Sequence, residues 1–470
     1  MRILLKDILY LSGNRLMYRR LYLIGLLAYV VMLIFSILFY KERIILIDTA
    51  DTLFYIISQN SFLIAIYRFG NIFNQVIPLL ALRAGAPLGE IMAGYSAGFV
   101  LYYAICYFVT GSILKRYDYA IVILLINTLF VSDTFYWIPS ELPQGIALLI
   151  IIYALIGNRS LNAISPFTWC ILFLALVTVA FYHPLLVFAM AYMFIFFFQQ
   201  TEHKKPLWVI GIGFCAILVL KAIFFRTPYE KHSMSGLKNF VALFPHYFSI
   251  YSNQQFLLKC LTTFYWIPVL FLAIVSLYCY NKEWKKLGVL LFFFFAYLFL
   301  VNISYYSAAT PAFYIENLYL PLSLFLALPF VFNVLPLLAT RKLAWPVLAL
   351  ILTTFAVRVY CKHTFYTARL NWERKFMADH PGKKMIYPSS KVPMDTLLMV
   401  WGTPYEFWLL STIEQSKTAS IIIDDKPDLR NWASGITRSM IVNWSVVPYE
   451  KLNPKYFHLT DTTTGYEIIK

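Results

Sequence analysis

The chain has 470 residues, of which 60% are hydrophobic and 13% charged, and it carries a formal net charge of +16. Soluble domains contain about 25% charged and about 45–50% apolar residues, so this composition argues against a soluble enzyme. Nucleic-acid binding would require Lys and Arg clustered on a soluble face, whereas many of them stand here in short segments between apolar runs. We therefore expect a polytopic helical membrane protein that contacts membrane lipids and binds no nucleic acid.

Eleven apolar runs are candidates for membrane-spanning helices, each of which needs about 20 predominantly apolar residues. The third and fourth runs are short for a span. The first lacks a small-residue cleavage site, which favours a retained anchor over a removed signal peptide. The runs are 21–40, 89–111, 119–133, 142–157, 165–181, 184–200, 207–225, 261–280, 287–304, 317–338 and 343–361.

Lys and Arg in the short connections predict the orientation, because cytoplasmic loops carry an excess of both. The connections 134–141, 182–183 and 305–316 contain neither, and we place them outside. This pattern puts the N-terminus in the cytoplasm, and an odd number of spans then puts the C-terminal domain outside. The fifteen basic residues on the cytoplasmic side would be Arg2, Lys6, Arg15, Arg19, Arg20, Lys115, Arg116, Arg159, Lys204, Lys205, Lys282, Lys285, Lys286, Arg341 and Lys342.

The spans divide the chain into a transmembrane domain, residues 1–361, and a soluble outer domain, residues 362–470. The transmembrane domain has a first outer loop at 41–88 and a second large one at 226–260. No internal repeat is visible, which weakens the case for an inverted-repeat transporter.

The C-terminal domain contains three short strand patterns, at 385–388, 420–424 and 466–470, and a helix-like stretch around Asp395 to Gln415. This mixture predicts a small α/β unit. None of the six cysteines falls in the domain, and no CxxC or Cys/His metal spacing occurs anywhere, so the sequence predicts neither a disulfide framework nor a metal site. The expected fold class is an all-α polytopic membrane protein of about eleven helices with a small C-terminal α/β domain.

In the first outer loop, Arg68, Asn71 and Gln75 are spaced i, i+3 and i+7. One helix would carry all three on a single face above an apolar remainder, and such a helix lies in the membrane interface. The alternative is a re-entrant segment broken at Pro78.

Two acids, Asp48 and Asp51, follow the first apolar run directly in the segment IILIDTADTLFYI. Carboxylates three residues apart share one face of a helical turn, and apolar neighbours raise the pKa of a carboxyl toward that of a useful general base. The alternative interpretation is that both are helix caps or ordinary interface charges.

The next outer connection, SDTFYWIPSELPQG, holds Asp133 and Glu141 beside Trp137. Trp at this depth usually belongs to an interfacial belt, but two acids need compensation where they are buried. His183, in FYHPLL, is more often a satisfied residue at a helix end, yet it can hydrogen-bond a phosphate or a sugar hydroxyl. Asp133, Glu141 and His183 are therefore candidates for positioning a donor or an acceptor.

Cations on the outer side are candidates for binding phosphate, for which the planar fork of Arg is the better partner. Lys221 stands near the end of the seventh run, where it can snorkel. The absence of a Gly-rich phosphate loop, HExxH and GxSxG argues against nucleotide hydrolysis and zinc proteolysis. The phosphate-binding candidates are Arg68, Arg83, Arg226 and Lys231.

This layout resembles the GT-C class of integral-membrane glycosyltransferases, which includes protein O-mannosyltransferases and lipid A aminoarabinose transferases. The similarity lies in the cytoplasmic N-terminus, the acids directly after the first span, interfacial helices in that loop, about eleven spans and an outer C-terminal domain. Asp48 and Asp51 occupy the place of the family's acidic motif, as DTAD rather than an adjacent acidic pair. The outer acids with Trp137, and the pair His183-Pro184, look similar to outer loops of such enzymes.

The resemblance implies an inverting transfer from a polyprenyl-phosphate-linked sugar. Asp51 or Asp48 would deprotonate a hydroxyl of a glycan, lipid or protein acceptor, and the cations would stabilise the polyprenyl phosphate that leaves. The sequence identifies no cofactor and leaves a divalent cation open. Its residue usage and the positive-inside pattern suit the bacterial inner membrane.

Two other functions stay open. A polysaccharide polymerase or ligase would share the polytopic plan but would carry its cations in a large outer loop and end in a short tail, whereas about 110 residues follow the last run here. A transporter or flippase of lipids or glycans would need ionisable groups near the bilayer midplane. Apart from Lys221 the apolar runs are nearly free of charge.

Overall fold

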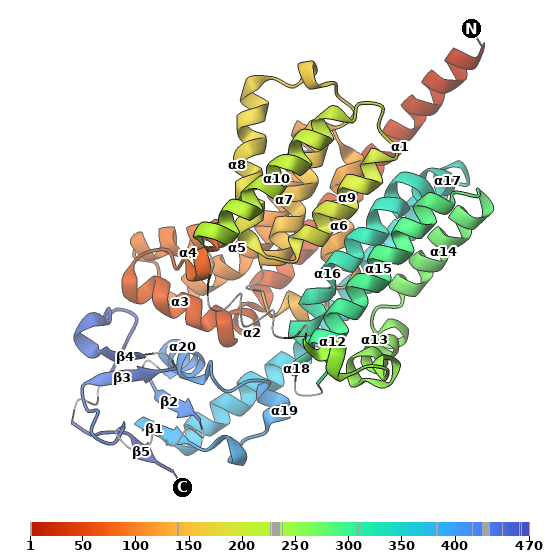
Figure 1. Ribbon diagram of the computed structural model, residues 1–470. Helices are drawn as coiled ribbons and strands as arrows, with labels where there is room; N and C mark the ends of the chain where they lie inside the picture. The colour runs from red at the N-terminus through yellow and green to blue at the C-terminus, as the bar shows by residue number, and fades with distance from the viewer. Residues whose placement is uncertain are drawn as a thin grey trace.

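The computed structural model describes residues 2–138, 141–225, 227, 236, 238–307, 310–381, 384–415, 417–424, 433–443, 445–459, 461 and 463–469, with side chains from Leu16 onward. Figure 1 shows a bundle of long helices with the N-terminus at one end and the strands of the C-terminal region at the other. The helices that coincide with the eleven predicted runs are α1 (Arg2–Leu38), α5 (Leu88–Phe108), α6 (Tyr117–Leu129), α7 (Glu141–Ile156), α8 (Pro166–Tyr182), α9 (Leu186–Phe198), α10 (Lys205–Phe224), α14 (Trp266–Tyr280), α15 (Trp284–Ser304), α16 (Ala312–Pro329) with α17 (Leu335–Thr340), and α18 (Ala344–Asp379).

Six helices in the described part of the chain are long and apolar enough to cross a membrane. A seventh span exists if α13 (Tyr251–Thr262) and α14, which are bent by 89° at a short break, count as one. The chain is therefore a helical multi-pass membrane protein, but the expected number of eleven spans is not confirmed. The six helices are Leu16–Leu38, Leu88–Ile113, Lys205–Phe224, Trp284–Ser304, Ala312–Thr340 and Ala344–Asp379.

The helices α6, α7, α8 and α9 are apolar but have only 10–17 residues each. In α6 every side chain from Tyr119 to Ile126 is buried. A helix that is hydrophobic on all sides is typical of the centre of a bundle, where it contacts protein rather than lipid. The short apolar runs at 119–133 and 142–157 therefore form the core of the bundle.

Alternate connections meet at the same end of the bundle, as antiparallel packing requires. Arg116, Asn158 and Gln200, which follow α5, α7 and α9, line one pocket. At the opposite end, Arg68 in the first loop contacts Glu141 at the start of α7. The distribution of Lys and Arg predicts that the first group faces the cytoplasm and the second the outside. Which end faces the cytoplasm stays a prediction.

The first loop folds into α2 (Tyr40–Ile44), α3 (Ile47–Gln59), two 3-10 turns (Ala65–Tyr67 and Phe69–Asn71) and α4 (Ile72–Arg83). The expectation that one helix carries Arg68, Asn71 and Gln75 is wrong, because α4 begins only at Ile72. The Gln75 side chain turns back to bond both the backbone N–H and the carbonyl of Leu63, at 2.7 and 2.8 Å. Pro78 lies inside α4 and does not break it.

The C-terminal region contains a parallel sheet of order β2-β1-β5, formed by β1 (Lys384–Tyr387), β2 (Ser420–Ile423) and β5 (Glu467–Ile468). These strands lie at the three strand patterns of the sequence. The crossover between β1 and β2 holds α19 (Met394–Leu397) and α20 (Thr403–Gln415), as a parallel pair requires. β3 (Ser439–Val442) and β4 (Ser445–Pro448) form an antiparallel pair.

The C-terminal region and the first loop share one hydrophobic core. Phe54 of α3 packs edge-on against Trp408 and Tyr405 of α20, with ring centroids 5.3 and 5.2 Å apart, and Trp408 stacks on Phe457 at 4.6 Å. α18 continues past the expected boundary at residue 361 into this region. The C-terminal region is therefore built onto the bundle through α3 and α18 (Figure 1).

The remaining elements are short. They are the helix α12 (Asn239–Ala242), the π turns Val109–Ile113 and Phe330–Val334, and the 3-10 turns Asp133–Phe135, Leu161–Ala163, Tyr247–Ser249, Ser389–Lys391 and Tyr449–Lys451.

Candidate functional site

Asp48 lies in the first turn of α3, at the end of the bundle that carries the C-terminal region. The indole N–H of Trp137 donates to Asp48 Oδ2 at 2.8 Å. Burial raises the pKa of Asp48 to about 6, Glu141 and Glu406 add to the rise, and the Trp137 bond and Arg68 oppose it. A carboxyl in this state exchanges a proton close to neutral pH.

Arg68 and Glu141 form an ion pair at 2.8 Å beside Asp48. Glu141 is the first residue of α7, where the positive end of the helix dipole favours a carboxylate. The two side chains are 17% and 11% exposed, so water screens the pair only partly. The structure thus brings three of the predicted site residues together although they are far apart in the sequence.

His183 belongs to the same neighbourhood. Burial lowers the pKa of His183 to about 3, and the positive charges of Arg68 and Lys221 lower it further. The imidazole is therefore neutral at physiological pH, and its Nδ1 accepts the backbone N–H of Leu185 at 3.2 Å. A neutral His with one nitrogen engaged in this way offers its other nitrogen for a hydrogen bond.

Asp51 lies one turn further along α3 and faces Tyr405 of the C-terminal region. Burial raises the pKa of Asp51 to about 7, the charge of Asp48 adds to the rise, and the Tyr405 hydroxyl opposes it. Its surroundings are the shared hydrophobic core, whereas those of Asp48 are the Arg68–Glu141 pair and Trp137.

Asp133 does not join this cluster. Its Oδ1 accepts from Lys362 Nζ at 2.9 Å and from the Tyr366 hydroxyl at 3.0 Å, both on α18. It lines a separate cavity with Glu316, while Trp137, four residues later, reaches Asp48. Of the two candidate acids of this connection, Glu141 lies beside Asp48 and Asp133 lies at the separate cavity.

Of the remaining predicted phosphate ligands, Arg83 is the one that lies among the described residues. Arg83 is exposed at the end of α4, outside the Asp48 cluster, and its guanidinium donates to the carbonyl of Asn60 at 3.4 Å. Arg226 and Lys231 lie outside the described residues.

Arg43 is a buried cation that no sequence pattern indicated. Its guanidinium donates to the carbonyls of Phe135 and Ser96, at 2.6 and 3.2 Å, and lies over the Phe135 ring. Burial lowers the pKa of Arg43 to about 9. Arg43 and Trp137 line a narrow cavity of about 70 Å³. Nothing in the local sequence KERIIL distinguishes this Arg from an interface charge.

A buried ion cluster holds the backbone that leads into Asp48. Glu406 of α20 accepts the backbone N–H of Ile47 and pairs with Arg369 of α18, which also binds Glu373 at 3.0 Å and the carbonyl of Ile45 at 2.9 Å. All three ionic side chains are at most 1% exposed. The start of α3 is therefore positioned by two elements that lie more than 300 residues later in the chain.

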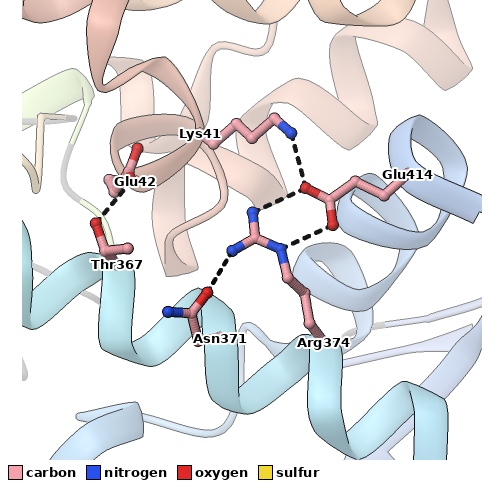
Figure 2. A network of polar contacts seen from close by, with 6 residues as sticks. All are labelled: Lys41, Glu42, Thr367, Asn371, Arg374 and Glu414. Carbon is pink, nitrogen blue, oxygen red and sulfur yellow. Dashed lines mark hydrogen bonds and ion pairs between the residues drawn. The ribbon is translucent and has the colours of Figure 1, made fainter.

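Figure 2 shows a second network that ties α2 to the same elements at the surface. The Glu414 carboxylate accepts hydrogen bonds from Lys41 at 2.7 Å and from two guanidinium nitrogens of Arg374, each at 2.8 Å. The Thr367 hydroxyl donates to Glu42 at 2.9 Å. Together the two networks fix both sides of the turn between α2 and α3.

The described residues contain no group of three or more His, Cys, Asp and Glu side chains placed to hold a metal ion. What the fold and the cluster define is a multi-pass helical membrane protein with buried acids and cations collected at one end of its bundle. Neither a family model, nor a curated protein, nor a solved structure matches the chain.

Proposed function

We propose that the chain is a membrane glycosyltransferase of GT-C type, which moves a sugar from a polyprenyl-phosphate donor to a glycan, lipid or protein acceptor on the outer face of a membrane. The observation that carries the proposal is Asp48, a carboxyl with a pKa of about 6 held beside the Arg68–Glu141 pair. A base with this pKa is largely ionised at pH 7 to 8 and still accepts a proton.

Asp48 is the better candidate than Asp51 for the general base. Asp48 shares its surroundings with a cation, a second acid and an indole donor, all polar groups that a sugar can contact. Asp51 faces Tyr405 within the shared core. We therefore assign proton transfer to Asp48 and a supporting role to Asp51.

In the proposed reaction the acceptor hydroxyl gives its proton to the Asp48 carboxylate while its oxygen forms a bond to the anomeric carbon. The bond between that carbon and the donor phosphate oxygen breaks, and its electron pair leaves on the polyprenyl phosphate. Arg68, and Lys221 beside His183, supply positive charge close to this group. Neutral His183 is suited to bonding a sugar hydroxyl.

The test uses a strain that lacks the gene, complemented with wild type or with Asp48→Asn at matched expression. Mass spectrometry of surface glycans and lipid-linked sugars is the readout. We expect Asp48→Asn to leave one sugar missing from the glycans while its polyprenyl-phosphate donor accumulates.

Asp118→Asn is the matched control, because Asp118 pairs with Arg116 at the opposite end of the bundle. It should restore the glycans fully. Full restoration by Asp48→Asn as well would overturn the proposal and favour a transporter or flippase, which needs no general base.

A further inference from the structure

A second cavity, of about 550 Å³, lies between the break that joins α13 to α14, the start of α16, and α18. It is separate from the Asp48 cluster, because its wall includes Asp133 rather than Trp137. Its lining combines the cations Lys259, Arg358 and Lys362 with the acids Asp133 and Glu316.

The charged side chains that line the cavity include more cations than acids. Lys362 is 33% exposed and is held over the cavity by Asp133. Lys259 projects from α13, close enough for its charge to act on Glu316. Arg358 adds charge from within the wall, where its guanidinium donates to the carbonyls of Val131 and Thr263 at 3.0 and 2.8 Å. Such a set favours an anionic group at the cavity mouth.

Glu316 gives the cavity a hydrogen-bond acceptor in addition to its cations. Its side chain is 1% exposed, and Oε1 accepts from the backbone N–H groups of Ser132 and Thr134 at 2.6 and 2.8 Å. Oε2 is buried and has no hydrogen-bond partner among the described residues. A buried acceptor without a partner costs free energy, so an occupant that donates a hydrogen bond is favoured.

Exposed apolar side chains surround the cavity. Val357 and Tyr265 in its wall are 55% and 36% exposed. Leu258 and Leu261 on α13 are 52% and 77% exposed. On α18 the cavity lies where the apolar run ends and Lys362 begins the polar part. Exposed apolar side chains beside a cationic cavity fit an amphiphile whose head enters and whose tails remain outside.

We propose that this cavity binds the head group of a phospholipid that carries a hydrogen-bond donor next to its phosphate, as a glycerol hydroxyl or a primary ammonium does. The phosphate contacts Lys259 and Lys362, and the donor reaches Glu316 Oε2. The proposal needs no catalytic base and stands apart from the transfer reaction.

The experiment is native mass spectrometry of the full-length protein in detergent, titrated with phosphatidylglycerol, phosphatidylethanolamine or phosphatidylcholine. Phosphatidylcholine has the same phosphate but no N–H or O–H donor in its head group. We expect the first two lipids to bind more tightly than the third. Each lysine near a lipid phosphate contributes about a fivefold change in affinity, so Lys259→Gln should weaken binding by about that factor.

Val357→Trp is the second variant, because it fills the mouth of the cavity from an exposed position without disturbing a buried ion pair. Lys285→Gln is the matched control, since it neutralises one exposed lysine at the start of α15. Val357→Trp should abolish the binding and Lys285→Gln should leave it unchanged.

Equal affinity for the three lipids, or wild-type binding by Lys259→Gln and Val357→Trp, would overturn the proposal. Displacement of the bound lipid by inorganic phosphate at equal concentration would also overturn it, because the site would then recognise the free ion. Loss of glycan transfer in Asp48→Asn has no bearing on any of these outcomes.

Discussion

Gly402 lies directly against the backbone of Ile47, so that a Cβ at position 402 would come within 2.6 Å of Ile47 Cα. Ile47 itself has a φ of +38°, a conformation that a β-branched residue rarely adopts. The hydrogen bond from Ile47 to Glu406 and the close approach of Gly402 together hold this strained residue in place. Asp48 follows immediately, so its position depends on the segment that precedes α20 and on α20 itself.

Gly402→Ala should destabilise the protein and misplace Asp48. Overpacking in a filled interior costs typically about 1–3 kcal/mol, and here the added methyl group meets backbone, which has little room to move. Thermal unfolding in detergent measures the loss. Gly288→Ala is the control, because nothing lies within 4 Å of a Cβ at that position in α15. Replacing Gly in a helix is expected to stabilise by roughly 0.5–1 kcal/mol. Equal melting temperatures for the two variants would contradict the close contact.

Glu406→Gln should move the acidic limb of the pH–activity profile to lower pH. The charge of Glu406 raises the pKa of Asp48, so its removal lets Asp48 ionise at lower pH. The rate of labelling of Asp48 by a carbodiimide, which attacks protonated carboxyls, measures the same shift without any substrate.

Glu373→Gln is the matched control for that experiment. Glu373 binds the same Arg369 but makes no contact with Ile47 among those described, and it is not among the charges that act on Asp48. We expect it to destabilise the fold without moving the titration of Asp48. Identical shifts in both variants would assign the effect to the loss of the cluster as a whole.

Asp48→Asn should make the folded protein more stable at pH 8. The folded-state pKa of about 6 lies above the unfolded value, so the ionised carboxyl disfavours folding once the pH exceeds about 4. The penalty grows between about pH 4 and pH 6 and is constant above that range. The gain at pH 8 should be on the order of 3 kcal/mol and should vanish near pH 4. Melting curves at both pH values test this, and a gain of equal size at pH 4 would refute the electrostatic origin.

Arg68→Gln should reduce transfer by about 10²–10³-fold, the range found when a group that stabilises developing charge is removed. It also leaves Glu141, 11% exposed, without its ion-pair partner. Arg68→Lys keeps the charge but loses the planar fork of the guanidinium, so it should retain part of the activity. Arg83→Gln, an exposed change on the same loop, should stay within twofold of wild type by the same glycan assay. A larger loss in Arg83→Gln than in Arg68→Gln would contradict the site.

Hydropathy and local residue spacing predicted most of the helices and strands of this protein and the position of its acids along the chain. The apolar runs coincide with helices, the three strand patterns lie at β1, β2 and β5, and the acids after the first run lie at the start of α3. Each of these features depends on residues that are neighbours in the chain, so the sequence alone is enough to predict it. The alternation of basic and non-basic connections likewise grouped the loops that meet at each end of the bundle.

Only the tertiary structure decided which polar groups meet. Arg68 pairs with Glu141 rather than lying on a helical face with Gln75, and Asp133 turns to α18 while Trp137, four residues away, turns to Asp48. Glu406 reaches Ile47 across 359 positions of sequence. Contacts of this kind depend on how helices pack in three dimensions, and hydrophobic packing is set by many residues at once. The sequence by itself therefore determined the helices and the position of the acids along the chain, whereas packing decided which acid received a cation, an indole and an environment that raises its pKa.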